Sequence, residues 1–230
     1  MSAADAAGPG LALFDLDGTL IPRDSDHAFG EFVVQLGWTD GEDFRRRNDA
    51  FYDDYLHGRL DMAAYVDFAT APWRGRTPAE LEGALARFVE QVVRPMLHRS
   101  ALDLVQHHRD AGDRLAIVTA TNEVVTRPIA ALFGIETLIA TELERDAGGR
   151  VTGRIAGVPA FREGKITRVQ QWLAGEGLTL DGFGRSIFYS DSTNDLPLLE
   201  RVSHPVATNP GTALEGHARQ RGWSVIRLFT

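Results

Sequence analysis

Two carboxylates follow a short apolar segment near the start of the chain. Asp15 and Asp17 open the hexapeptide 15–20, which comes directly after the apolar residues 11–14. If residues 11–14 form a buried strand, both side chains emerge at the carboxyl edge of a sheet, where open α/β sheets bind their ligands. Gly18 then permits a sharp turn, and Thr19 adds a hydroxyl donor. This composition is typical of a nucleophile loop, and an ordinary Asx turn shares it.

Three further polar sites follow predicted strands or begin predicted helices. Thr119 ends a second apolar segment and precedes the small residue Ala120. Lys165 heads an amphipathic helix, and the polar run 191–195 follows the apolar strand candidate 186–190. The carboxyl ends of parallel strands lie along one edge of a sheet, so all of these sites can converge on a single crevice.

The residue types at these sites suit phosphoryl transfer. Such a reaction needs a nucleophile, a divalent cation and donors that neutralise the phosphoryl oxygens. Asp15 can act as nucleophile, and Asp17 can transfer protons if its pKa is raised. Mg²⁺ is bound by one or two carboxylates and several waters, which Asp15 and Asp191 can provide with the Asp17 carbonyl. Lys165 and Thr119 remain as donors to the phosphate.

The elements that position these residues fall into two groups. Residues 22–98 carry apolar side chains at helical spacing, and Thr77, Pro78 and Glu80 form a capping-box pattern that predicts a helix over 78–93. This segment predicts an all-helical insert, the cap, joined to a core of residues 1–21 and 99–230.

From residue 99 helices and strands alternate along the chain. Such alternation predicts an α/β fold with a doubly wound, Rossmann-like parallel sheet and right-handed crossovers. Residues 137–143 and 151–155 flank a turn-rich segment and predict a β-hairpin. The final strand is expected within 225–229.

Composition narrows the function classes. The 230 residues carry a formal charge of −8 and no cysteine. The negative charge argues against nucleic acid as a partner, and the lack of thiols excludes disulfides and cysteine nucleophiles. No segment approaches the roughly 20 apolar residues that span a bilayer. We therefore expect a soluble cytoplasmic protein with no membrane partner. The seven histidines show no metal-ligand spacing, and we assign them structural roles.

The four sites together resemble the motifs of the haloacid dehalogenase superfamily, in the same order. The resemblance implies that Asp15 is the covalent nucleophile and Asp17 the general acid and base, with an aspartyl-phosphate intermediate. It implies Mg²⁺ as cofactor and a small phosphorylated metabolite as substrate. The metal site is then formed, directly or through an outer ring of contacts, by Asp15, Asp17, Asp191 and Asp195. The phosphate is expected to bind Thr119, Ala120, Lys165 and Asn194.

The cap resembles that of the phosphoserine phosphatase-like branch, which recognises a substrate amine through an acid nine residues after the nucleophile. Asp24 stands at that place, and Asp26 is a second candidate. The branch also uses a cap arginine for the substrate carboxylate, for which Arg59 is only a weak match. We therefore expect an amino-alcohol phosphate, with histidinol phosphate preferred because bacterial histidinol-phosphate phosphatases resemble this chain. The alternatives are phosphoserine or another small phosphomonoester, phosphotransfer to a sugar hydroxyl, and a non-catalytic phosphate sensor.

Overall fold

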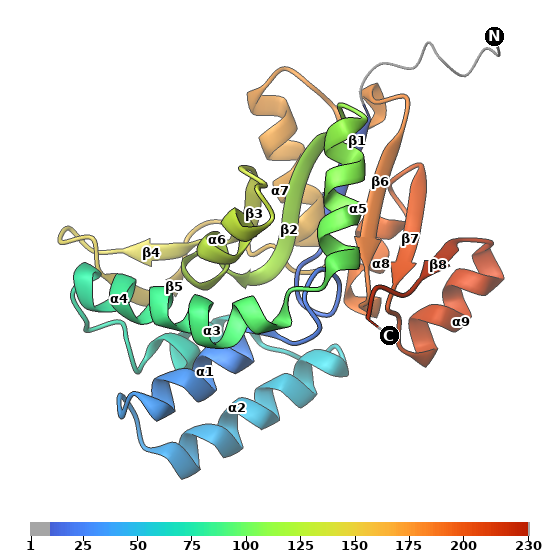
Figure 1. Ribbon diagram of the computed structural model, residues 1–230. Coiled ribbons are helices and arrows are strands. Elements are labelled where there is room, and N and C mark those ends of the chain that lie inside the picture. The colour runs from blue at the N-terminus through green and yellow to red at the C-terminus, as the bar shows by residue number, and fades with distance from the viewer. Residues whose placement is uncertain (1–9, 230) are drawn as a thin grey trace, which may run out of the picture.

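The computed structural model describes residues 10–229 and places a six-stranded parallel sheet at the centre of the molecule (Figure 1). The strand order is β3-β2-β1-β6-β7-β8, so β1 lies inside the sheet with β2 and β6 as neighbours. The predicted α/β class and parallel sheet are confirmed. The strands are β1 (Leu11–Phe14), β2 (Arg114–Asn122), β3 (Leu138–Thr141), β6 (Ser186–Ser190), β7 (His204–Thr208) and β8 (Ser224–Ile226).

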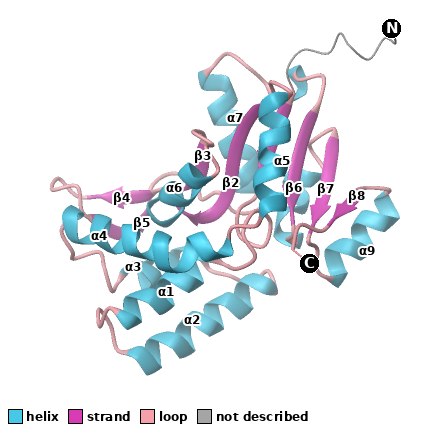
Figure 2. Ribbon diagram, in the orientation of Figure 1, coloured by secondary structure: helices cyan, strands magenta, loops and turns pink. Residues whose placement is uncertain are grey.

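Each face of the sheet is covered by helices because alternate strand residues point to opposite sides. Ala12 and Phe14 join the apolar cluster formed with α5 (Arg99–Asp110) and α6 (Glu123–Leu132). Leu11 and Leu13 join a second cluster on the opposite face. Figure 2 shows these helices flanking the strands. The second cluster is formed with α7 (Glu163–Gly175), α8 (Leu196–Leu199) and α9 (Thr212–Arg221).

The segment between β1 and α5 is helical, as expected. Its helices are α1 (Ser25–Gln35), α2 (Gly41–Leu56), α3 (Met62–Thr70) and α4 (Pro78–Phe88). Thr77 and Glu80 form the predicted capping box at the start of α4. The helix predicted to reach Val93 ends at Phe88, and a wider π-type turn follows over Val89–Val93. Pro95 explains the irregularity, since its ring obstructs a regular turn and it donates no hydrogen bond.

The predicted hairpin is confirmed only in part, and it lies beside the cap helices. Residues 151–155 form one of its strands, but most of the predicted partner, 137–143, forms β3 of the main sheet. Strands β4 (Leu143–Arg145) and β5 (Val151–Ile155) pair antiparallel, outside the main sheet. β5 packs against α3, and Figure 1 shows the hairpin next to the cap. The hairpin, which comes after β3 in the chain, is therefore a neighbour of the cap. Residues 1–9 and 230, which the sequence assigned to the core, lie outside the described residues.

Two strand boundaries differ from the predicted ones. β2 continues to Asn122, with a register shift after Val118, where a loop was expected. The last strand ends at Ile226 because the Asn209 side chain accepts a hydrogen bond from the Leu228 amide at 2.6 Å. Within residues 10–229, no helix combines the length and apolar character needed to cross a membrane.

Candidate active site

The nucleophile loop follows β1 and is held by its neighbours. Asp15 is 3% exposed, and its amide donates to the Tyr189 carbonyl at 2.9 Å. Gly18 has φ +76°, and a Cβ there would lie 2.2 Å from Asp191 Oδ2. Only glycine meets both conditions, because other residues rarely adopt this φ and their Cβ would displace the carboxylate. Asn209, directly after β7, donates from Nδ2 to the Gly18 carbonyl at 2.9 Å and so fixes the turn.

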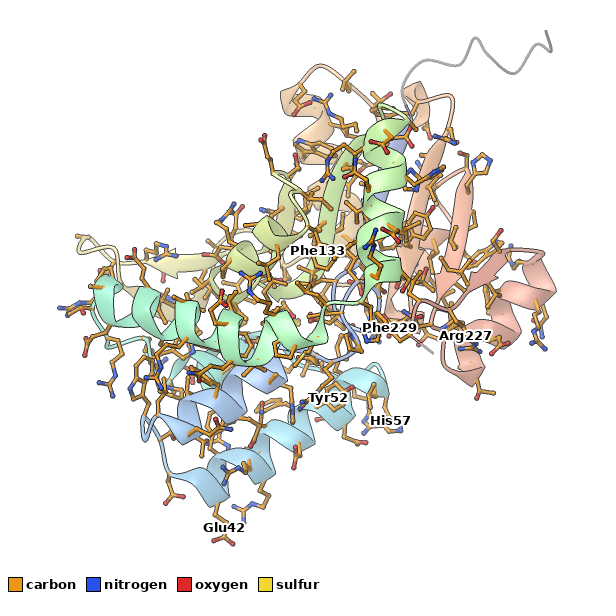
Figure 3. The ribbon with its side chains drawn as sticks, in the orientation of Figure 1. Glu42, Tyr52, His57, Phe133, Arg227 and Phe229 are labelled. Carbon is orange, nitrogen blue, oxygen red and sulfur yellow. The ribbon has the colours of Figure 1, made fainter. Side chains whose placement is uncertain are left out.

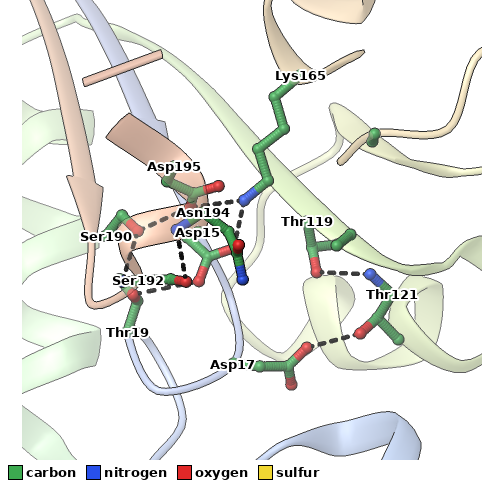
Figure 4. Close-up of polar contacts among 12 residues, drawn as sticks. Asp15, Asp17, Thr19, Thr119, Thr121, Lys165, Ser190, Ser192, Asn194 and Asp195 are labelled. Carbon is green, nitrogen blue, oxygen red and sulfur yellow. Dashed lines mark hydrogen bonds and ion pairs between the residues drawn. The ribbon is translucent and has the colours of Figure 1, made fainter. Parts of the chain in front are cut away.

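Lys165 joins two carboxylates in the interior of the site, as Figure 4 shows. Its Nζ lies 2.8 Å from Asp15 Oδ1 and 2.7 Å from Asp195 Oδ2, and its side chain is 1% exposed. Burial opposes the charge on Lys165, but the two carboxylates outweigh it and raise the pKa of Lys165 above its usual value. Lys165 is therefore a permanent cation against the nucleophile. Ser190 Oγ donates to Asp195 at 2.7 Å and holds that carboxylate in place.

Asp191 stands on the other side of the nucleophile. The Thr19 hydroxyl lies 3.1 Å from Asp191 Oδ1 and 3.3 Å from Asp15 Oδ2, so the two carboxylates share one neighbour. Burial, with the charges of Asp15 and Asp195, raises the pKa of Asp191 well above its usual value. Burial also raises the pKa of Asp15 to about 7, although the Lys165 charge opposes the shift.

These carboxylates fit a magnesium ion. Burial destabilises the ionised forms of both acids, and a bound divalent cation would stabilise them. Mg²⁺ is commonly bound by one or two carboxylates together with waters. Among the described residues, no cluster of three or more acidic or histidine side chains is arranged around one point. Asp15 and Asp191, which converge on the Thr19 hydroxyl, would hold the ion. The Asp195 carboxylate binds Lys165 and Ser190, and its predicted metal role would be indirect.

Asp17 turns toward the cap. Its Oδ1 accepts from the Ser25 amide at 2.7 Å and its Oδ2 accepts from the Thr121 hydroxyl at 2.8 Å. Burial and the nearby charge of Asp24 raise the pKa of Asp17 to about 7, although the Ser25 and Thr121 contacts oppose this shift. A carboxyl group that titrates near neutral pH can both give and take a proton under physiological conditions.

The Thr119–Thr121 segment faces the nucleophile from β2. All three residues line the cavity above Asp15. The Thr119 hydroxyl accepts from the Thr121 amide at 3.2 Å, which leaves its own proton for another acceptor. Asp15, Asp17, Thr119, Ala120 and Lys165, all selected from the sequence, therefore meet at one edge of the sheet.

The cap closes this cavity with aromatic side chains. The space left free inside the cavity is small, about 30 Å³, so its walls must move apart to admit a ligand. No arginine or lysine of residues 10–229 belongs to its lining. Besides the residues of the core, it is lined by Asp24, His27, Asn48, Phe51, Tyr52, Tyr55, Leu60, Met62 and Tyr65. Figure 3 labels Tyr52 on α2 and Phe229 on the C-terminal segment, which both line the groove at the mouth.

The two candidate amine acids have different environments. Asp24 lines the cavity and accepts from the His27 amide at 2.7 Å as the N-cap of α1. Asp26 is buried, accepts from Asn122 Nδ2 at 3.1 Å and is not among the residues that line the cavity. Burial raises the pKa of each carboxyl to about 6. Asp24 is therefore the one placed to meet a ligand.

Two other predicted residues are engaged by the cap. Asn194 Nδ2 donates to the Tyr55 carbonyl at 2.9 Å, so its predicted role in phosphate binding would require it to exchange or share this contact. Arg59 is exposed and pairs with Asp53 and Asp54 at 3.2 and 3.1 Å, outside the cavity lining. It is not positioned to bind a substrate carboxylate in this arrangement.

Several residues of the site were not predicted from the sequence. Thr121 follows the recognised Thr119 by two positions and could have been found by strand alternation alone. Asn209 has φ +49° and binds a loop about 190 positions earlier, and no local pattern indicates that contact. His27, which was assigned a structural role, lines the cavity.

Comparison with known proteins agrees with this geometry. Residues 12–200 match the model of the haloacid dehalogenase-like hydrolases, and the chain belongs to this family. It is similar to a histidinol-phosphatase of Neisseria meningitidis, with 44% identity over 218 residues that cover 95% of this chain and 98% of the relative. It is also 30% identical to a phosphoserine phosphatase of Mycobacterium tuberculosis, covering 93% of this chain and 69% of that protein.

Solved structures show the same fold. A Bordetella pertussis protein described as having unknown function shares 49% identity and a TM-score of 0.91, and the match covers 96% of this chain and 99% of that one. A substrate-bound phosphoserine phosphatase is similar in fold only, with 15% identity and a TM-score of 0.67 over 96% of this chain and 94% of the other. The chain is thus a hydrolase of phosphoric monoesters, as the sequence predicted, with substrates among small phosphorylated metabolites.

Proposed function

We propose that this enzyme is a magnesium-dependent histidinol-phosphate phosphatase that works through an aspartyl-phosphate. The observation that supports this choice of substrate is the lining of the cavity above Asp15. Besides Asp15 and Asp17, it combines a third carboxylate, Asp24, with several aromatic rings, and no arginine or lysine of the described residues lines it. An ammonium group and a flat ring fit these walls, and a substrate carboxylate would lack a partner.

The residues that line the cavity offer a partner for each group of histidinol phosphate. Its phosphate would lie beside Asp15, its ammonium group beside Asp24, and its imidazole among the aromatic residues of α2 and α3. Tyr52 and His27 already form a tilted aromatic pair at the cavity wall, with ring centroids 5.3 Å apart. Aromatic pairs of this kind contribute to binding beyond the area they bury. The similarity to the Neisseria histidinol-phosphatase over nearly the whole of both chains supports the same assignment.

The reaction would proceed in two displacements. A carboxylate oxygen of Asp15 attacks phosphorus, the bond to the ester oxygen breaks, and Asp17 gives that oxygen its proton. Asp17, now ionised, then removes a proton from water, which attacks phosphorus and breaks the bond to Asp15. Lys165 keeps its charge throughout and opposes the charge that develops on the phosphoryl oxygens. Mg²⁺, held by Asp15 and Asp191, would neutralise the phosphate when bound.

Phosphate release from purified enzyme tests the proposal. Histidinol phosphate, phosphoserine and p-nitrophenyl phosphate are compared with MgCl₂ and after exhaustive chelation, with Asp15→Asn as the inactive control. We expect the highest kcat/KM on histidinol phosphate, loss of activity on chelation and recovery with Mg²⁺. A preference for phosphoserine would overturn the substrate, and activity that survives chelation would overturn the metal.

A further inference from the structure

Core side chains hold the C-terminal end of α2. Asn194, which follows β6, donates from Nδ2 to the Tyr55 carbonyl at 2.9 Å. Arg162, which precedes α7, donates from Nη2 to the Gly58 carbonyl. Its Nε also faces Asn194 Oδ1 at 3.5 Å, so the two core side chains adjoin each other. Tyr55 lines the substrate cavity, and the contact therefore joins the cap to the core beside the site.

The contact follows from the chemistry of a helix end. The last carbonyls of a helix lack partners within the helix and carry partial negative charge, which favours a cation. α2 has no basic residue in its last turn. Arg59 pairs with the side chains of Asp53 and Asp54, whereas the cation that binds the Gly58 carbonyl just beyond the helix belongs to the core, more than 100 positions later in the chain. This stabilisation exists only while the end of α2 rests on the core.

Gly58 is adapted to the approach of Arg162. It has φ +67°, and a Cβ there would lie 2.5 Å from Arg162 Nη2 and 3.4 Å from Asn194 Oδ1. A methyl group at this position would thus force the guanidinium to shift away from the Gly58 carbonyl. Gly37 offers a comparison, since it follows α1 with φ +69° and a Cβ there would meet nothing within 4 Å.

Arg162 itself is held in a strained backbone conformation. Its φ of 52° and ψ of −123° are unfavourable for a residue with a side chain. Such strain persists where surrounding contacts impose it, often at functional sites. Here the Lys165 amide donates to the Arg162 carbonyl at 3.0 Å, so the strained residue directly precedes the helix that carries Lys165 to the nucleophile. The Arg162 guanidinium also lies over the Phe161 ring, 5.2 Å from its centroid.

We propose that Arg162 is a positioning residue that clasps the end of α2 to the core, and so holds Tyr55 over the nucleophile and orients the Asn194 amide. We call the contact among Arg162, Asn194, Tyr55 and Gly58 the clasp. Loss of the clasp lowers the population of the closed cap. A substrate that binds only under the closed cap then binds more weakly in proportion, while the chemistry of the bound complex is largely kept.

Hydrogen exchange and kinetics on Arg162→Ala test the clasp. The amides of Gly58 and Arg59, which close the end of α2, should exchange roughly tenfold faster or more, as expected for loss of a hydrogen bond to a charged group. KM for histidinol phosphate should rise, by at most the same factor, with a smaller change in kcat. Unchanged exchange at these two amides would overturn the proposal. Exchange needs no substrate, so this result is independent of which ester the enzyme prefers.

The glycine pair provides the matched control and a second route if Arg162→Ala does not fold. Gly58→Ala and Gly37→Ala impose the same backbone strain, but only the first displaces Arg162. We expect Gly58→Ala to raise KM and exchange at the end of α2, and Gly37→Ala to leave both unchanged. In the Arg162→Ala background, Gly58→Ala should add no further rise in KM. Equal effects of the two glycine variants would show that strain, and not the clasp, is responsible.

Discussion

Asp24→Asn separates substrate recognition from helix capping. Asparagine caps helices about as well as aspartate, so the hydrogen bond from the His27 amide survives and stability should change by less than about 0.5 kcal/mol. The amide cannot offer a charge to a substrate ammonium group. Loss of a hydrogen bond with a charged partner costs about 1.5–3 kcal/mol, which corresponds to roughly 10- to 150-fold in kcat/KM.

The assay compares histidinol phosphate with p-nitrophenyl phosphate, which has no amine, on the parent and the variant. The loss should be confined to histidinol phosphate. The pH dependence has a defined sign, because burial raises the pKa of Asp24 to about 6. Asp24 is mostly ionised at pH 7, and its contact with the amine should weaken as the pH falls through 6. The parent should therefore lose its preference for the amine-bearing ester on acidification, and Asp24→Asn should not.

Asp26→Asn is the control for this experiment. Asp26 is buried against Asn122 and is not among the residues that line the cavity. An amide there faces the Asn122 donor, so we expect a stability loss of about 1–3 kcal/mol and equal effects on both esters. If Asp24→Asn also lowered activity equally on both esters, Asp24 would only cap α1. The assignment of an amine-bearing substrate would then have no carboxylate to support it.

Three further variants test the core. Asp15→Asn should stay folded, with an unchanged melting temperature, yet release no phosphate above background, because an amide forms no acyl phosphate. Gly18→Ala should lower kcat/KM by about 100-fold, since its Cβ would stand 2.2 Å from Asp191 and misplace that carboxylate; activity near that of the parent would contradict this reading of the loop. Burial lowers the pKa of His108 below 6.5, so the unfolded chain binds the extra proton and stability should fall as the pH drops below about 6.5. The free energy of unfolding, measured with urea at several pH values, should depend less steeply on pH in His108→Asn than in the parent.

Much of this protein could be predicted from local patterns. Asp15 lies at a strand end because a short apolar run places it there, and Lys165 lies in the first turn of α7 as expected. The capping box at Thr77 and the helical insert are likewise local properties of the chain. Each of these depends on residues a few positions apart, and hydrophobic periodicity and capping chemistry report such short-range order directly.

Other features were decided only by the tertiary structure. Asp24 and Asp26 are both candidates in the sequence, and the course of α1 turns one to the cavity and the other to Asn122. The hairpin joins the cap because of what it packs against, and Arg162 reaches Gly58 across 104 positions. Contacts between residues so far apart in the chain depend on how separate elements pack. Propensity and hydrophobic periodicity are local properties, so they do not identify the distant residue that a side chain will contact.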